Sequence, residues 1–359
     1  MQDWTALNRV LSQTQQKPLS RRNLLARSTQ LGLASSILLP LLAPERATAG
    51  VRPITLKFGY TSTPTNPVSV GYEKFASLVR EKSHNELNVV TFCCNQMGND
   101  AQLVQSVQSG ALQLGTSSNN NLDQFTSACM ALELPYLIKS RSVYHKLWST
   151  PTGESLRRKM EADLGLKILM VMDAGGFRSI ETRTRQVHVP GDLKGIKLRA
   201  ANTPIELATF KRWGANPVPL PYNQVFTALQ QGTVEGEILQ PIWFYTDKHY
   251  EAAKHISHIH YVMLAHVGFM NPNAFNRLPK DMQAIILEAA TEAEDFEWKY
   301  AGGAVAKADA ALKARPGVTW YEPTASELDV WETTSRPVWK EFSGKISSNL
   351  LREIDALNA

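Results

Sequence analysis

The stretch GANPVPLPYNQVFTALQQGTVEGEIL, residues 214–239, decides how the chain is expected to fold. Its segment PVPL is typical of a short strand, and YNQVFTALQQ has the apolar spacing of a helix that Gly232 ends. The segment GEIL then predicts a second short strand. A strand, a helix and a strand in immediate succession favour an α/β fold, in which helices flank parallel sheets.

The same alternation extends toward the amino terminus. ITLKFGY, residues 54–60, alternates as a half-buried strand does, and residues 69–83 place apolar side chains at helical spacing. A further strand, helix and strand are expected at residues 87–92, 99–110 and 112–118. KILMVMD, residues 167–173, is a continuous apolar run, which predicts a central strand covered on both faces.

A long helix is expected from Lys280 to about Arg315. At ~1.5 Å per residue it would span roughly 50 Å, more than one compact domain requires. Gly302 and Gly303 lie in its middle and would permit a kink. We therefore expect this helix to tie two lobes together.

The amino terminus has the layout of a secretory signal. Arg21 and Arg22 precede a modest apolar segment, residues 31–43, which leads to small residues ending at Ala49. The adjacent arginines predict export by the twin-arginine route, with cleavage near Ala49, so that residues 1–49 are a signal peptide. This leader holds six basic and two acidic residues, +4 of the full-chain +5, so the mature chain carries about +1. That charge does not support nucleic-acid binding.

The cysteines and histidines predict neither a disulfide framework nor a metal centre. The three cysteines, Cys93, Cys94 and Cys129, are expected to be buried small hydrophobes, with a bridge to Cys129 as the alternative. His258 and His260 would share one face of a strand, but no cysteine or well-spaced carboxylate stands near them in the sequence. We therefore expect no metal site.

Four stretches together resemble the substrate-binding proteins of tripartite ATP-independent periplasmic (TRAP) transporters. They are residues 214–237, QMGNDAQLVQSVQSGALQLGTSS at 96–118, ELPYL at 133–137, and residues 176–200. Their order and spacing agree with the family from about residue 54 to residue 342. The resemblance implies the α/β periplasmic binding protein fold, with two lobes around a ligand cleft and a long helix spanning both. It places lobe I at residues 50–175 and 266–305, and lobe II at 176–265 and 306–359.

The resemblance also assigns ligand contacts. DLKGIKLR, residues 192–199, puts the family's carboxylate-binding arginine at Arg199, and a guanidinium fork suits a carboxylate geometrically. The alternative for Arg199 is an ion pair with Glu206. Arg178 is expected to touch the ligand or to support Arg199, beside a chain crossing eased by Gly175 and Gly176. Further expected contacts, each with a cap, turn or core-packing role as its alternative, are Asn66, Gln96, Ser118, Phe177, Gln240 and Trp243.

The function that this resemblance implies is that of a periplasmic solute receptor. It would capture a small organic acid by an arginine salt bridge and lobe closure, and deliver it to the small and large TRAP membrane subunits. We expect no catalysis, no cofactor, no nucleic-acid partner, and a monomer or homodimer. The alternatives are a twin-arginine-exported enzyme and a ligand-sensing protein with the same fold. C4-dicarboxylates, keto or hydroxy acids, sugar acids and aromatic acids all remain open as ligands.

Overall fold

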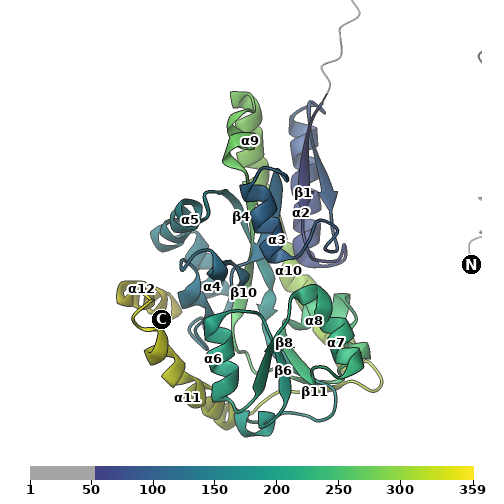
Figure 1. The fold of residues 1–359 in the computed structure, drawn as a ribbon, viewed down its shortest axis with the longest axis vertical. Coiled ribbons are helices and arrows are strands. Elements are labelled where there is room, and N and C mark those ends of the chain that lie inside the picture. The colour runs from purple at the N-terminus through teal and green to yellow at the C-terminus, as the bar shows by residue number, and fades with distance from the viewer. Residues whose placement is uncertain (1–52) are drawn as a thin grey trace, which may run out of the picture. The chain divides into compact units, whose positions relative to one another are not determined.

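A computed structural model describes residues 53–359, which form two β-sheets flanked by helices (Figure 1). We call the first sheet and its helices lobe I, at the top of Figure 1. Its five strands run in the order β2-β1-β3-β10-β4. The strands are β1 (Ile54–Gly59), β2 (Leu87–Phe92), β3 (Leu114–Ser118), β4 (Lys167–Phe177) and β10 (Met263–Met270).

Lobe II contains the second sheet, at the bottom of Figure 1. Its six strands run in the order β11-β9-β5-β8-β6-β7. The strands are β5 (Ser179–Thr182), β6 (Lys197–Ala200), β7 (Asn216–Pro219), β8 (Gly236–Leu239), β9 (His255–Ser257) and β11 (Thr319–Tyr321).

Helices flank both sheets, and their positions follow the caps in the sequence. Asn99 caps α3 and Gly232 ends α7 in the left-handed conformation. The α-helices are α2 (Pro67–Lys82), α3 (Asp100–Gln108), α4 (Arg141–Trp148), α5 (Pro151–Leu164), α6 (Pro204–Arg212), α7 (Val225–Gln231), α8 (Pro241–Thr246), α9 (Pro272–Asn276), α10 (Lys280–Lys313), α11 (Ala325–Phe342) and α12 (Ser348–Asn358).

The expectation of parallel sheets is wrong, because both sheets are mixed. β1 pairs in parallel with β2 and β3, and β6 pairs in parallel with β7 and β8. However, β10 runs antiparallel to β3 and β4, and β5 runs antiparallel to β8 and β9. β5 and β10 are the strands that the chain enters directly after crossing between lobes, so no helical crossover sets their direction.

β4 is an edge strand, although its apolar run predicted a central one. Helix α10 covers that edge and hydrogen-bonds to its backbone. Glu294 Oε2 accepts the Val171 N–H at 2.7 Å, and Trp298 Nε1 donates to the Val171 carbonyl at 2.9 Å. Side chains thus replace the missing neighbouring strand, which explains why β4 is buried along almost its whole length.

α10 spans both lobes, as expected. It packs on α2 and β4 of lobe I and on α8 and β11 of lobe II. The helix continues through Gly302 and Gly303. It therefore provides one continuous element that contacts both sheets.

Two of the crossings of the chain between the lobes lie side by side. Arg178 connects β4 to β5, and residues 258–262 connect β9 to β10. The two crossings are hydrogen-bonded to each other, because Arg178 N donates to the Val262 carbonyl and Tyr261 N donates to the Arg178 carbonyl. The Asp173 side chain accepts the N–H groups of Gly175 and Gly176 at 2.8 and 3.0 Å, which fixes the turn before the first crossing.

Two expected lobe assignments differ from the sheets. β10 begins at Met263, so the lobe I sheet starts three residues before the expected boundary at residue 266. α11 packs on α6 of lobe II, whereas α12 packs on α4 of lobe I. The carboxy-terminal segment therefore contacts both lobes instead of belonging to lobe II alone.

The cysteine expectation holds only for Cys129, which is free and buried. Cys93 and Cys94 are joined in a disulfide at the end of β2, and Cys94 is exposed, so the expectation of buried thiols is wrong for this pair. The expected signal peptide, residues 1–49, lies outside the described residues. Within residues 53–359, no helix is both long and apolar enough to cross a membrane.

The turn at Gly175 and Gly176 has space for a methyl group at only one of the two positions. Both residues have positive φ, 103° and 84°. A Cβ at Gly175 would lie 2.1 Å from Ile242 Cγ2, whereas one at Gly176 would meet only Val305 Cγ1, at 3.9 Å. Each alanine should lower the free energy of unfolding by about 1–3 kcal/mol through backbone strain. Gly175→Ala should lose more than Gly176→Ala because of the added clash.

Chemical denaturation of the two variants measures this difference. The double variant Gly175→Ala/Ile242→Ala should lose less stability than the two single changes together, because the clash disappears. Equal losses for Gly175→Ala and Gly176→Ala would contradict the packing argument.

Candidate functional site

A cavity lies between the lobes, where strand ends of both sheets approach each other. Its lining encloses about 460 Å³ not filled by protein atoms, open solvent at its mouth included. The lining residues are Thr61, Asp100, Ser118, Asn120, Asn121, Ala174, Arg178, Arg199, Ala201, Tyr222, Leu239, Gln240, Trp243, Leu264 and His266.

Arg199 provides an unneutralised positive charge in the cavity wall. It lies on β6 and is 5% exposed. Its Nε and Nη2 donate to the Leu220 carbonyl at 3.1 and 2.8 Å. Within residues 53–359, Arg199 forms no salt bridge. Burial lowers its pKa, but a guanidinium stays protonated at any physiological pH.

Arg178 also lines the cavity, but Glu206 neutralises its charge. Glu206 lies in the first turn of α6, and its carboxylate accepts Arg178 Nη1 at 2.7 Å and Nη2 at 3.3 Å. Arg178 Nε donates to the Ile238 carbonyl at 3.1 Å, and Glu206 also accepts the Ala201 N–H at 2.7 Å. Burial disfavours the charged guanidinium, but Glu206 outweighs it and raises the pKa of Arg178. The ion pair expected as the alternative for Arg199 is thus made by Arg178.

Lobe I contributes polar groups and a carboxylate to the cavity wall. Asp100, the first residue of α3, accepts the Ser118 N–H at 3.1 Å, and it is 7% exposed. Ser118 Oγ donates to Asn120 Oδ1 at 2.6 Å, and Asn120 Nδ2 reaches Glu206 of lobe II at 3.5 Å. These side chains follow β2 and β3, at the strand ends where open α/β sheets bind ligands.

Two buried polar atoms in the wall have no hydrogen-bond partner among the described residues. They are Gln240 Nε2, at the start of α8, and His266 Nδ1, on β10. Trp243 stacks on His266 with ring centroids 5.0 Å apart and donates from Nε1 to the Ala174 carbonyl at 2.6 Å. Burial lowers the pKa of His266 to about 4, so its imidazole is neutral at pH 7. Buried polar atoms of this kind normally bond to water or a ligand.

Behind the wall of lobe II lies a buried acidic pair. Glu181 on β5 is paired with Glu237 on β8, and His249 Nδ1 lies 2.6 Å from Glu237 Oε1. Burial, followed by the charge of Glu237, raises the pKa of Glu181 well above its usual range. Burial opposes the charge of His249, but Glu237 outweighs it and raises the pKa of His249. His249 is thus the partner of Glu237 inside lobe II, whereas the two Glu181 oxygens have no hydrogen-bond partner among the described residues.

The structure brings five of the eight predicted site residues to the cavity. Arg178, Arg199, Ser118, Gln240 and Trp243 line it.

The other three predicted residues lie elsewhere. Asn66 caps α2, accepting the Val68 N–H at 3.2 Å, and reaches Thr246 Oγ1 at 3.5 Å. Gln96 is exposed in the loop after β2, and Phe177 packs on the His260 ring, with centroids 5.7 Å apart.

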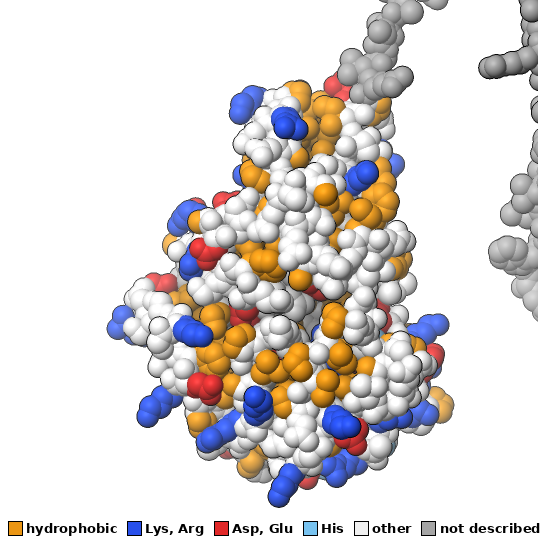
Figure 2. Space-filling model, viewed as in Figure 1, with side chains coloured by type: hydrophobic (Ala, Val, Ile, Leu, Met, Phe, Trp, Pro, Cys, Tyr) orange, Lys and Arg blue, Asp and Glu red, His pale blue; other side chains and the backbone are white. Residues whose placement is uncertain are grey.

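Sequence reasoning missed several polar lining residues, chiefly Asp100, Asn120, Tyr222 and His266. Asp100 opens the helix that follows β2, and an acidic residue at that place was a usable signal. His266 is a polar residue inside the apolar run VMLAHVGFM, a second signal. On the face seen in Figure 2, Lys and Arg side chains are spread over both lobes, with acidic side chains among them.

Removing the carboxylate of Glu206 should destabilise the fold strongly. Glu206→Gln leaves the buried Arg178 guanidinium without a counterion, which costs about 3–5 kcal/mol of unfolding free energy. Denaturant unfolding measures the loss, with Glu86→Gln, an exposed glutamate of lobe I, as the matched control. The double variant Glu206→Gln/Arg178→Gln should recover part of the loss. A loss no larger than that of the control would contradict the role assigned to the pair.

The chain is similar in sequence to a known family of bacterial proteins. Residues 58–345 match the family described as "Bacterial extracellular solute-binding protein, family 7". The chain is 28% identical to the 2,3-diketo-L-gulonate-binding periplasmic protein YiaO of Escherichia coli, over 70% of this chain and 76% of YiaO. It is also 28% identical to the C4-dicarboxylate-binding periplasmic protein DctP of Rhodobacter capsulatus, over 95% and 99% of the two chains.

A solved structure also resembles this chain. The TRAP periplasmic solute binding protein from Ochrobactrum anthropi is 29% identical, covers 86% of this chain and 95% of its own, and superposes with a TM-score of 0.75. The chain belongs to family 7 of the bacterial extracellular solute-binding proteins, the substrate-binding components of TRAP transporters.

Proposed function

We propose that this protein is a periplasmic receptor that captures one small organic acid between its lobes and delivers it to TRAP membrane subunits. The observation that carries the proposal is Arg199, a buried guanidinium in the cavity wall without a carboxylate partner in residues 53–359. A buried charge needs a counterion, and a ligand carboxylate would supply one. The guanidinium fork can meet it with two parallel hydrogen bonds.

The cavity charges favour an acid with a single carboxylate. Of the two lining arginines, Arg178 is neutralised by Glu206, which leaves Arg199 alone to bind an anion. Asp100 lines the same cavity from lobe I and is an acceptor with a negative charge. A second carboxylate near Asp100 would be repelled, whereas a hydroxyl group could donate a hydrogen bond to it.

The remaining lining also suits a hydroxylated body. Ser118, Asn120 and Gln240 offer hydroxyl and amide groups, and Gln240 Nε2 is a buried donor without a partner in the described chain. Such groups satisfy hydroxyls in several directions. We therefore propose a polyhydroxylated monocarboxylate, such as a sugar acid. The two relatives divide on this point, since YiaO is named for a sugar acid derivative and DctP for C4-dicarboxylates.

Lobe closure would seal the ligand from water. Besides the two adjacent crossings, hydrogen bonds join the lobes between the loop before α2 and the end of α8. Thr63 Oγ1 donates to Asp247 Oδ1 at 2.6 Å, and Asn66 Nδ2 reaches Thr246 Oγ1 at 3.5 Å. Opening must break these contacts. In this proposal Asn66 therefore stabilises the closed form and does not contact the ligand. Export through the twin-arginine leader, with cleavage near Ala49, remains part of the proposal.

The proposal includes no catalytic step. In this proposal the lining arginine binds the ligand carboxylate and the lining amides bind its hydroxyl groups. These contacts recognise the ligand and do not change it. The neutral His266 stacks on Trp243, and we assign it a hydrogen-bonding role toward the ligand.

Replacing Arg199 should abolish tight binding. Arg199→Gln removes the cation and should weaken binding of a sugar acid such as galactonate by about two to four decades, or roughly 3–5 kcal/mol. Lys197→Gln, an exposed cation two residues earlier on β6, is the matched control and should bind as the wild type does. Isothermal titration calorimetry measures both. Equal affinities of Arg199→Gln and the wild type for the acid that the wild type binds would refute the assignment.

Asp100 should set the preference between mono- and dicarboxylates. In thermal-shift measurements, galactonate or D-erythronate should stabilise the wild type more than succinate does. A ligand at 100 times its dissociation constant contributes about 2.7 kcal/mol. Asp100→Asn removes the repulsion and should improve succinate binding relative to galactonate. A wild type that prefers succinate would contradict the charge argument, and one that binds no organic acid would contradict the receptor function.

A further inference from the structure

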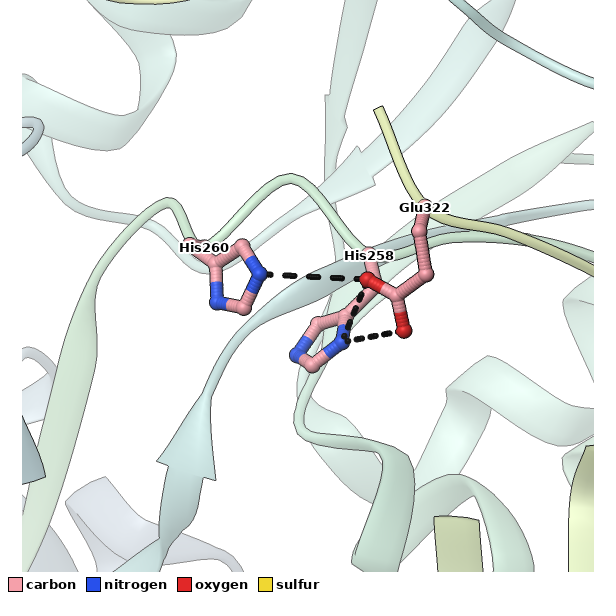
Figure 3. A group of neighbouring side chains, drawn as sticks. All are labelled: His258, His260 and Glu322. Carbon is pink, nitrogen blue, oxygen red and sulfur yellow. Dashed lines mark hydrogen bonds and ion pairs between the residues drawn. The ribbon is translucent and has the colours of Figure 1, made fainter. Parts of the chain in front are cut away.

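A second group of chemistry-bearing side chains lies outside the cavity, at the edge of the lobe II sheet. Figure 3 shows His258, His260 and Glu322 turned toward one another. β9 and β11 are parallel neighbours with Ser257 opposite Tyr321, so His258 and Glu322 follow directly at the ends of adjacent strands. The bond from His258 N to the Tyr321 carbonyl, 2.9 Å, holds the two strand ends together.

The three side chains place their donor atoms close enough for a common ion. His258 Nδ1 lies 3.4 Å from Glu322 Oε2, and His260 Nε2 lies 3.9 Å from the same oxygen. One ligand atom from each residue falls within 4.8 Å of the others. Metal bonds of about 2.1 Å in a tetrahedron put ligand atoms about 3.4 Å apart, so modest side-chain rotations would close the site.

The backbone contributes to this convergence. His260 adopts a left-handed conformation with φ of 50°. The centroid of its ring lies 4.1 Å from that of the His258 ring. Side chains two residues apart on a loop can point in different directions, but these two are neighbours. The turn therefore presents both imidazoles to the Glu322 carboxylate.

Outer contacts orient the carboxylate and leave one oxygen for an ion. Glu322 Oε1 accepts Trp320 Nε1 at 2.7 Å and Lys313 Nζ at 3.2 Å, and it also lies 3.4 Å from His258 Nδ1. Oε2 lies near both histidines and accepts neither Trp320 nor Lys313. Such partners are typical around metal ligands. Lys313 opposes a cation by its charge, but its side chain is 48% exposed, so it can turn toward water.

We propose that His258, His260 and Glu322 form a binding site for a divalent metal ion of the zinc class. Two imidazole nitrogens and one carboxylate oxygen are a donor set that zinc prefers, with water completing the tetrahedron at this exposed position.

The ion would act on the fold and not on the ligand cavity. None of the three residues lines that cavity. His258 and His260 belong to the second crossing between the lobes, and Glu322 belongs to the segment that returns from α10. Metal binding should therefore fasten the crossing to the sheet edge and stabilise the protein without competing for the organic acid.

Titration of the untagged full-length protein with ZnCl2 tests the site. One equivalent of zinc should bind and raise the melting temperature, and Co2+ should give the visible absorption of a tetrahedral ion. His260→Asn and Glu322→Gln should each weaken zinc binding at least about tenfold. Removing a residue that only contacts a metal ligand already costs about tenfold or more, so removing a ligand should cost no less. Arg199→Gln should leave zinc binding unchanged, which separates this site from the cavity.

His84→Asn is the matched control for His260→Asn. His84 is exposed and has the same φ of 50° as His260, and asparagine tolerates that conformation in both places. The control should bind zinc as the wild type does. The proposal is overturned if the wild type binds no zinc at 100 times the protein concentration, or if His260→Asn and His84→Asn bind it equally well.

Discussion

The ion pair between Arg178 and Glu206 determines the electrostatics of the whole cavity. Arg178 is the residue at which the chain leaves lobe I, and Glu206 opens a helix of lobe II. Their bidentate contact fixes the first crossing to lobe II. It also cancels one of the two guanidinium charges in the wall, which leaves Arg199 as the group that a ligand must neutralise. A single buried contact thus connects the geometry between the lobes with the chemistry of binding.

The fold was predictable as far as local patterns specify it. Apolar spacing and caps located most strands and helices, and the long helical segment correctly indicated an element that contacts both lobes. Strand direction was not predictable in this way, because β5 and β10 take theirs from the crossings between lobes. β4 shows the same limit. Its apolar run is that of a central strand, but α10 supplies the cover that a neighbouring strand would give.

The candidate site was predictable where the sequence resembles the family. Residues 192–199 assigned the carboxylate-binding role to Arg199 by that resemblance, and both Arg199 and Gln240 line the cavity. Asn66 satisfies a helix end instead, and only the tertiary structure distinguishes a cap from a ligand contact. Glu322 illustrates the opposite failure. It stands far from His258 in the sequence, and the pairing of β9 with β11 brings it near.

The position of β10 has a consequence for biosynthesis. This strand lies between β3 and β4 in the sheet, but the ribosome makes it long after both. Until residue 270 has emerged, the nascent lobe I must keep a gap in its sheet, with two strand edges open to wrong partners. Lobe I therefore cannot finish folding before most of lobe II has been synthesised. The two lobes must mature together, and a chain truncated before β10 would lack the middle of its first sheet.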